Sequence, residues 1–261
     1  MLTDTPIERL KAIMRRLRDP QSGCPWDLAQ DFATLAPFTL EEASEVVDAL
    51  ERGDRDALRD ELGDLLFQVV FLSQLGAEEG RFDFDAVAAG IADKLLRRHP
   101  HVFEDAAAAQ DPSRSWDAIK ADERRGKGLH GVLADVPLSL PALARAAKLG
   151  RRAARVGFDW EDAAGARAKV LEEIAELDAA AQGGQTANMA EELGDLLLAV
   201  TSWSRHLGLD PETSLRKANR KFESRFAAME AVAAEQGLDP DSLTAAQWDA
   251  LWNEAKSRVQ S

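Results

Sequence analysis

L-E-E-I-A-E-L at residues 171–177 and E-E-L-G-D-L-L-L-A-V at residues 191–200 are the two stretches that decide the fold. In both, acidic residues stand three apart, and on a helix that spacing places them on the same face. Gly183-Gly184 lies between the stretches and is typical of a turn. The sequence therefore predicts two short antiparallel helices.

These two helices are predicted to bring four carboxylates close together. Glu173 and Glu176 would project together from the first helix, and Glu192 and Asp195 from the second. Carboxylates crowded in a partly buried place need a compensating cation. Oxygen-only ligands suit a hard ion, Mg2+ or Mn2+. The sequence therefore predicts a metal site with four ligands: Glu173, Glu176, Glu192 and Asp195.

The same pattern occurs a second time, 131 residues earlier. L-E-E-A-S-E-V begins at Leu40, as L-E-E-I-A-E-L begins at Leu171. D-E-L-G-D-L-L-F-Q-V begins at Asp60, as E-E-L-G-D-L-L-L-A-V begins at Glu191. Such self-similarity indicates tandem copies of one structural unit. A second metal site is expected at the matching carboxylates: Glu42, Glu45, Glu61 and Asp64.

The fold class is predicted to be all-α, because no stretch shows the alternation of a strand. Each copy should form one helical domain, at residues 1–125 and 142–261, and the segment 126–141, rich in glycine and proline, should link them. Helices are expected at residues 5–19, 38–50, 56–76, 83–98, 115–125, 143–155, 162–181, 186–207, 211–236 and 244–258.

Two features suggest that the acidic residues are more than a solvated face. Glu61 and Asp64 lead into residues 65–72, a section apolar on nearly every side that should be buried. Gly63 and Gly194 stand inside helices, where glycine costs about 1 kcal/mol relative to alanine. A packing or ligand reason is therefore expected for both glycines.

Composition limits the classes of function. The chain has 261 residues, 45% hydrophobic and 30% charged, so a globular core is expected. A net charge of −14 argues against nucleic acid as a partner. Cys24 is the single cysteine, no apolar run is long enough to span a membrane and no signal-peptide pattern is present, so a cytoplasmic location without membrane association is expected.

The paired E-E-x-x-E and E-x-x-D motifs, twice in a helical chain of this length, resemble the MazG family of nucleoside triphosphate pyrophosphohydrolases. Longer phrases strengthen the resemblance over nearly the whole chain: G-C-P-W-D, E-E-G-R-F-D-F, R-R-H-P-H-V-F, S-L-P-A-L, V-G-F-D-W and K-A-N-x-K-F. The resemblance implies tandem MazG-like domains, four-helix bundles formed on homodimerisation, Mg2+ as cofactor and cleavage between the α and β phosphates. It also implies broad ribo- and deoxynucleotide specificity and a housecleaning role.

The second copy has cationic and polar groups that the first lacks, so it is predicted to be the main catalytic site. Lys169 aligns with Phe38, and Lys217 and Asn219 align with Gly90 and Ala92. Triphosphate and carboxylates together are strongly anionic, and cations must balance them. The first copy supplies mainly Lys94, Arg98 and Lys120.

By resemblance, the catalytic set is Glu172, Glu173, Glu176, Glu192 and Asp195. Glu172 or Glu191 could orient or deprotonate the attacking water. Trp252 could stack on the base or fill the core. The expected nucleotide-binding residues are Lys169, Glu172, Glu191, Lys217, Asn219, Lys221, Arg225, Trp252 and Lys256.

Two other functions are also compatible with the sequence. One is a helical scaffold that only binds nucleotides or a partner such as a GTPase. The other is a narrower enzyme of the same fold, a dUTP or phosphoribosyl-ATP pyrophosphatase. A panel of substrates distinguishes the second alternative.

Overall fold

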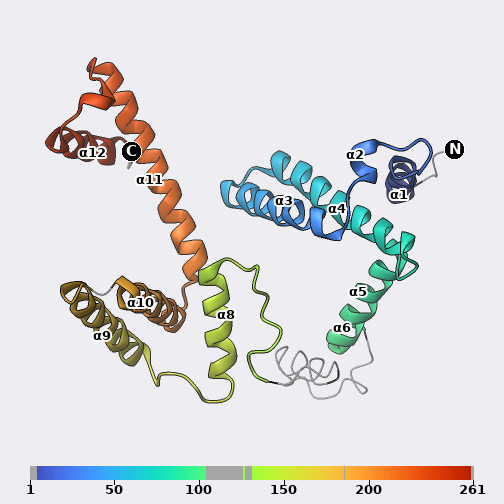
Figure 1. Ribbon diagram of the computed structural model, residues 1–261, viewed down its shortest axis with the longest axis horizontal. Coiled ribbons are helices and arrows are strands. Elements are labelled where there is room, and N and C mark those ends of the chain that lie inside the picture. Colours follow the sequence, from blue (N-terminus) through green and yellow to red (C-terminus); the bar gives the residue numbers. More distant parts are fainter. Residues whose placement is uncertain (1–4, 104–125, 127–130, 185, 260–261) are drawn as a thin grey trace. The chain divides into compact units, whose positions relative to one another are not determined.

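The computed structural model describes residues 5–103, 126, 131–184 and 186–259, which form helices and connecting loops without a strand (Figure 1). The all-α prediction is confirmed. The chain divides into two compact units, Met1–Ala121 and Asp122–Ser261. The domain boundaries drawn from the sequence stay a prediction, and the helix expected at 115–125 lies outside the described residues.

The first unit is built around a helical hairpin of α3 and α4. Its described helices are α1 (Pro6–Leu17), α2 (Pro25–Leu28), α3 (Phe32–Arg52), α4 (Arg55–Glu78), α5 (Phe84–Arg98) and α6 (Pro100–Phe103). Gly53 ends α3 with a left-handed φ of 73°, which lets the chain turn directly into α4. The short helices α2 and α6 lie outside the helices expected from the sequence.

The start of α3 differs from the prediction. A helix was expected at residues 38–50, but α3 begins at Phe32 and contains Pro37. The side chain of Asp31 accepts from the backbone N–H of Thr34, whose hydroxyl accepts in turn from the N–H of Asp31. This capping box satisfies the first donors of the helix and allows it to begin before the proline.

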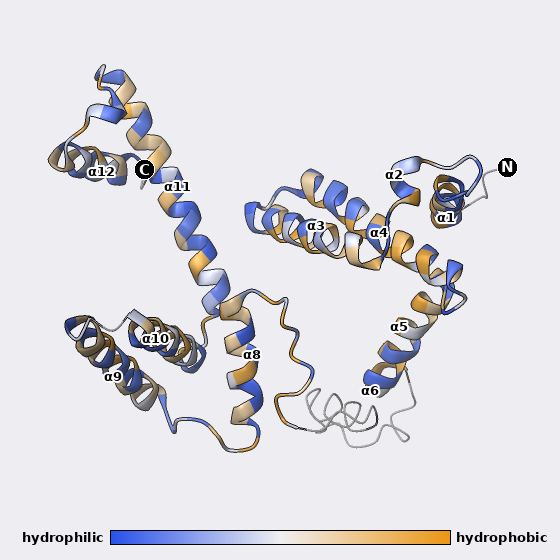
Figure 2. Cartoon of the chain, in the orientation of Figure 1, coloured by the Kyte–Doolittle hydropathy of each residue, from blue (hydrophilic) through white to orange (hydrophobic). Residues whose placement is uncertain are grey.

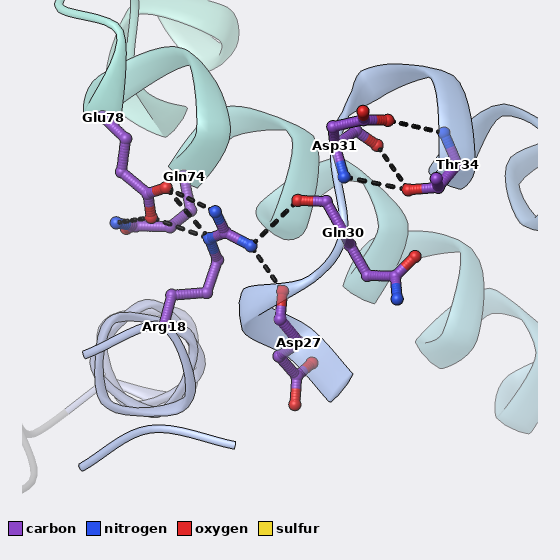
Figure 3. Close-up of polar contacts among 7 residues, drawn as sticks. All are labelled: Arg18, Asp27, Gln30, Asp31, Thr34, Gln74 and Glu78. Atoms are coloured by element: carbon purple, nitrogen blue, oxygen red, sulfur yellow. Dashed lines mark hydrogen bonds and ion pairs between the residues drawn. The ribbon is translucent and has the colours of Figure 1, made fainter. Parts of the chain in front are cut away.

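One arginine ties α1 to the hairpin (Figure 3). Arg18 donates through Nε and Nη2 to the carboxylate of Glu78 on α4, at 2.8 and 2.6 Å. Its Nη1 donates to the backbone carbonyls of Asp27 and Gln30. The underlying core is apolar and consists of Met14, Leu35, Val70, Phe71 and Leu75.

The second unit contains two helix pairs. Its described elements are α8 (Ala142–Ala154), α9 (Ala163–Gln182), α10 (Thr186–His206), α11 (Pro211–Glu235), the 3-10 helix η1 (Pro240–Ser242) and α12 (Ala245–Val259). Helix α9 packs along α10, α8 packs on α10, and α12 packs on α11. The core between α11 and α12 consists of Met229, Val232, Ala233, Leu251 and Ala255.

Part of the segment expected to be a linker is held against α8. Arg152, 7% exposed, donates to the carbonyls of Ala134 and Asp135. Val136 is also buried, whereas Leu138 is 85% exposed. Residues 134–136 of the segment are therefore held against α8, whereas residues 131–133 before them and 137–139 after them are exposed.

The expected burial of residues 65–72 is only partly correct. Val70 and Phe71 are buried, but Leu66 and Val69 are 40% and 36% exposed. In Figure 2 the part of α4 nearer to α5 is mainly orange, whereas its first half contains many blue residues. The run is apolar around most of the helix, but the described residues pack against only part of that surface. Some of its apolar side chains therefore stay exposed.

The equivalent helix α10 also exposes leucines, Leu193, Leu197 and Leu198. None of the described helices is both long and apolar enough to cross a membrane.

The two helical glycines have no side-chain packing partner among the described residues. A Cβ atom added at Gly63 or Gly194 would meet nothing within 4 Å. The packing explanation is therefore wrong for contacts among the described residues, and an intermolecular or ligand contact is the reason that stays open.

Candidate metal centre

Three of the four expected ligands in the second unit come together. Glu173 and Glu176 lie on α9 and Glu192 lies on α10, and each offers a carboxylate oxygen within 4.8 Å of the others. Helix α9 starts from the cap of Asp162, whose side chain accepts from the N–H of Gly165 at 2.8 Å. The close packing of α9 on α10 then sets the spacing of the three carboxylates. We call Glu173, Glu176 and Glu192 the C-terminal cluster.

Asp195 is exposed and lies outside this group of three, although the spacing predicted it as a fourth ligand. The charge of Asp195 nevertheless affects the pKa of Glu192. Desolvation raises the pKa of Glu192 above its usual value, and the charges of Glu176 and Glu173 act in the same direction. Asp195 and Glu191 add smaller contributions of the same sign to the pKa of Glu192. Such mutual repulsion is relieved by a bound cation.

Lys169 lies at the edge of the C-terminal cluster. Its Nζ lies 2.7 Å from Oε1 of Glu172 and 2.6 Å from Oε1 of Glu173. Hydrogen bonds to Glu172 and then to Glu173 raise the pKa of the lysine above its usual value. Lys169, which was expected to balance phosphate charge, is therefore close to the carboxylates and is paired with two of them.

One oxygen of the C-terminal cluster has no partner. Glu173 is 3% exposed, and its Oε2 is buried without a hydrogen-bond partner among the residues the structure describes. A buried carboxylate oxygen without a donor is costly. A divalent cation fits this position, since the neighbouring donors are all carboxylate oxygens.

The first unit contains a similar cluster. Carboxylate oxygens of Glu42, Glu45 and Glu61 lie within 4.8 Å of one another, and we call these residues the N-terminal cluster. Desolvation raises the pKa of Glu42, followed by the charges of Asp64 and Glu45. Asp64 is exposed and outside the group, as Asp195 is in the second unit.

Gln68 lies beside the N-terminal cluster and was not among the residues predicted from the sequence. A hydrogen bond from its side chain acts to lower the pKa of Glu42, against the effect of burial. Gln68 is 5% exposed, and its Oε1 has no partner in the described chain. The available signal was its alignment with Ala199, which shows that the two clusters have different polar neighbours.

The expected nucleotide-binding residues on α11 and α12 are not joined to the C-terminal cluster within the described chain. Lys217, Asn219 and Lys221 are exposed on α11 and make no ion pair or hydrogen bond with any described residue. They therefore stay predictions.

Two of the expected nucleotide-binding cations, Arg225 and Lys256, lie beside Trp252 within the α11–α12 helix pair. It packs partly buried against the α11–α12 core and against Phe222, with ring centroids 5.8 Å apart. Arg225 and Lys256 each lie 5.6 Å from the centre of its ring. The core role of Trp252 is thus visible, while the base-stacking role stays a prediction.

The fold and the two clusters thus define a class of all-α proteins in which pairs of acidic helices bring together carboxylates that could hold a divalent cation. The family model described as "MazG nucleotide pyrophosphohydrolase domain" matches residues 30–103 and 163–228. The chain belongs to this family, and the resemblance and enzyme class expected from the motifs are confirmed.

Similar proteins extend the match to almost the whole chain. A "Nucleoside triphosphate pyrophosphohydrolase" of Escherichia coli K12 is 50% identical over 96% of this chain and 97% of its own length. A Thermotoga maritima protein named "Nucleoside triphosphate pyrophosphohydrolase/pyrophosphatase MazG" is 39% identical over 96% of this chain and 95% of its own. A Mycolicibacterium smegmatis "Nucleoside triphosphate pyrophosphohydrolase" is 37% identical over 60% of this chain and 49% of its own.

Proposed function

We propose that the chain hydrolyses nucleoside triphosphates to the monophosphate and pyrophosphate at its C-terminal cluster. The observation that carries the proposal is the buried Oε2 of Glu173, unpartnered among the described residues and within a group of three carboxylates. Family membership supports the reaction class. Broad base and sugar specificity and a housecleaning role are part of the proposal.

Mg2+, or Mn2+ in its place, is the proposed cofactor, held by Glu173, Glu176 and Glu192 with Asp195 as the fourth ligand. When bound, such an ion polarises phosphate oxygens and makes a bound water more acidic. The all-oxygen donor set supports a hard ion over a softer one. The N-terminal cluster is proposed as a second metal site that serves mainly a structural role.

The chain's own residues are proposed to prepare the water and balance the phosphate charge. Water attacks phosphorus, the bridging P–O bond breaks and pyrophosphate leaves. Glu172 or Glu191 accepts the proton of the water. Lys169, Lys221 and Arg225 balance the charge that spreads over the phosphate oxygens.

The outer residues are proposed to hold the rest of the nucleotide. Lys217 and Asn219 contact phosphate or ribose, Trp252 stacks on the base, and Lys256 reaches phosphate or ribose. A stacking contact is tolerant of base identity, which fits broad specificity.

A homodimer is part of the proposal, because each unit exposes leucines that one chain does not cover. Leu66 on α4 and Leu197 on α10 are 40% and 49% exposed. Pairing of two copies would bury them at a four-helix interface. Sedimentation should give twice the chain mass of 28.5 kDa, and Leu197→Glu should lower it. The same change at Leu138, in the exposed segment before α8, should leave the mass unchanged.

The function is tested by pyrophosphate release from a mixed nucleoside triphosphate pool, with and without Mg2+. Glu173→Ala and Asp195→Ala should abolish release while helical content and melting temperature stay near those of the wild type. Full activity of both variants would overturn the C-terminal assignment. A panel of canonical, deoxy, deaminated and oxidised nucleotides then tests the breadth of specificity. A GTPase partner and a cytoplasmic location stay predictions.

A further inference from the structure

Lys169 lies where a metal ion and a triphosphate would both need space. Its ammonium is bonded to Oε1 of Glu173, while Oε2 of the same carboxylate is buried and has no partner among the described residues. The lysine side chain is 34% exposed, so its outer end can turn toward solvent. Lys169 therefore pairs with one oxygen of the buried Glu173 carboxylate and leaves the other oxygen for a ligand.

The first unit provides a natural comparison. The residue equivalent to Lys169 is Phe38, which packs edge-on against Trp26 with ring centroids 5.9 Å apart. Gln68, a neutral amide, is the polar group that approaches Glu42 instead. The N-terminal cluster thus has the same acids as the C-terminal cluster but no lysine at this place.

A divalent cation and an ammonium compete for the same carboxylate oxygens. When both are close to one carboxylate they repel each other, and the repulsion is strong where solvent is largely excluded. A triphosphate reverses the balance, because its oxygens offer the displaced ammonium a new anionic partner. Metal and nucleotide would then assist each other's binding.

We propose that Lys169 is a resident counter-ion that a divalent cation displaces from Glu173, and that the triphosphate then takes up the released ammonium. The C-terminal cluster therefore binds metal and nucleotide cooperatively, while the N-terminal cluster binds metal without this coupling. The inference rests on the proposed function, which places metal and triphosphate at the C-terminal cluster. Because coupling between two ligands is reciprocal, it can be measured from either side.

The test uses the full chain with the N-terminal cluster silenced by Glu42→Gln and Glu61→Gln. Mn2+ is titrated in without nucleotide and followed by the electron paramagnetic resonance signal of unbound Mn2+. Lys169→Met, which removes the charge and keeps the length, should tighten Mn2+ binding about tenfold or more. Unchanged or weaker binding in Lys169→Met would overturn the exchange.

The coupling is measured with ATP that carries a methylene group between its α and β phosphates, so that the bond cannot be hydrolysed. The dissociation constant without Mn2+ divided by that with Mn2+ should be about tenfold smaller in Lys169→Met than in its parent. The affinity of the analogue for Mn2+ itself cancels, since it is the same for both proteins. An equal ratio in the two proteins would overturn the cooperative part.

The reverse change provides the matched control. With the C-terminal cluster silenced by Glu173→Gln and Glu192→Gln, Phe38→Lys should weaken Mn2+ binding at the N-terminal cluster.

If Lys169→Met and its parent both fail to bind Mn2+ while their circular dichroism is unchanged, the proposed metal site itself is wrong. That result is distinct from tight but equal binding, which rejects only the role of the lysine.

Discussion

Glu173 on α9 and Glu42 on α3 occupy equivalent places in the two units but differ in burial: Glu173 is 3% exposed, whereas Glu42 is partly exposed. Burial of a carboxylate is tolerated only when a cation or hydrogen-bond donors compensate it. The demand for a cation is therefore greater in the second unit. The two clusters share one sequence motif and are distinguished by this difference in burial.

Neutralising these two glutamates should have unequal effects on activity. Glu173→Gln keeps the size of the side chain and removes its charge, and it should lower pyrophosphate release by about 100-fold or more. Glu42→Gln should lower it less than about threefold, since the N-terminal cluster is not proposed to turn over substrate. A larger loss in Glu42→Gln than in Glu173→Gln would assign catalysis to the first unit.

Gly194 should be needed for activity and not for stability. The Cβ of an alanine at this position in α10 would meet no described residue within 4 Å outside its own helix backbone, so the change should stabilise the helix by about 0.5–1 kcal/mol. If the open space next to Asp195 accommodates substrate or a second copy, Gly194→Ala should still lower pyrophosphate release, by about tenfold.

The matched control is Gly63→Ala in α4, which should stabilise its unit by a similar amount and leave activity near that of the wild type. Melting temperature and pyrophosphate release are measured on the same preparations. Unchanged activity in both variants would remove any functional reason for the glycines.

The parts predicted well from the sequence are those set by local spacing. The helices carrying Glu173 and Glu192 follow from three-residue spacing and a glycine turn, and both are present as predicted. The burial of residues 65–72 could not be predicted, because an apolar run does not say whether its own chain or another covers it. The placement of Trp252 and Lys256 could not be predicted either, since spacing fixes faces within a helix but not which helices meet.

Arg18 should contribute substantially to the stability of the first unit. Its side chain is 9% exposed and joins Glu78 and two backbone carbonyls, and it lies 5.5 Å from the centre of the Phe71 ring. Arg18→Met would leave these acceptors without their donor and should lower the free energy of unfolding by about 3 kcal/mol.

Arg258 provides the comparison for Arg18. It pairs with Glu235 and Glu254, but its side chain is 42% exposed, so Arg258→Met should change the free energy of unfolding by less than about 1 kcal/mol. Urea unfolding of both variants measures the difference. Equal losses would mean that the buried network of Arg18 adds nothing beyond an exposed ion pair.

Asp159 should make the second unit sensitive to acid in a definite pH range. Hydrogen bonds from Arg205 and then His206, at the end of α10, lower the pKa of its carboxyl from 3.8 to about 2. Because the folded-state pKa is the lower one, the stabilisation is complete above about pH 4 and is lost as the pH falls toward 2. Its size should be on the order of 1–2 kcal/mol, since the side chain is 20% exposed.

The measurement is the free energy of unfolding from pH 5 to pH 2, compared between the wild type and Asp159→Asn. The variant should be less stable at pH 5, and the two curves should approach each other as the pH falls to 2, where about half of the folded wild-type carboxyls are neutral. The difference between the curves isolates Asp159, because the other acidic groups titrate in both proteins. Parallel curves over this range would show that the pairing with Arg205 does not hold the pKa down, and that Asp159 acts only through its shape and hydrogen bonds.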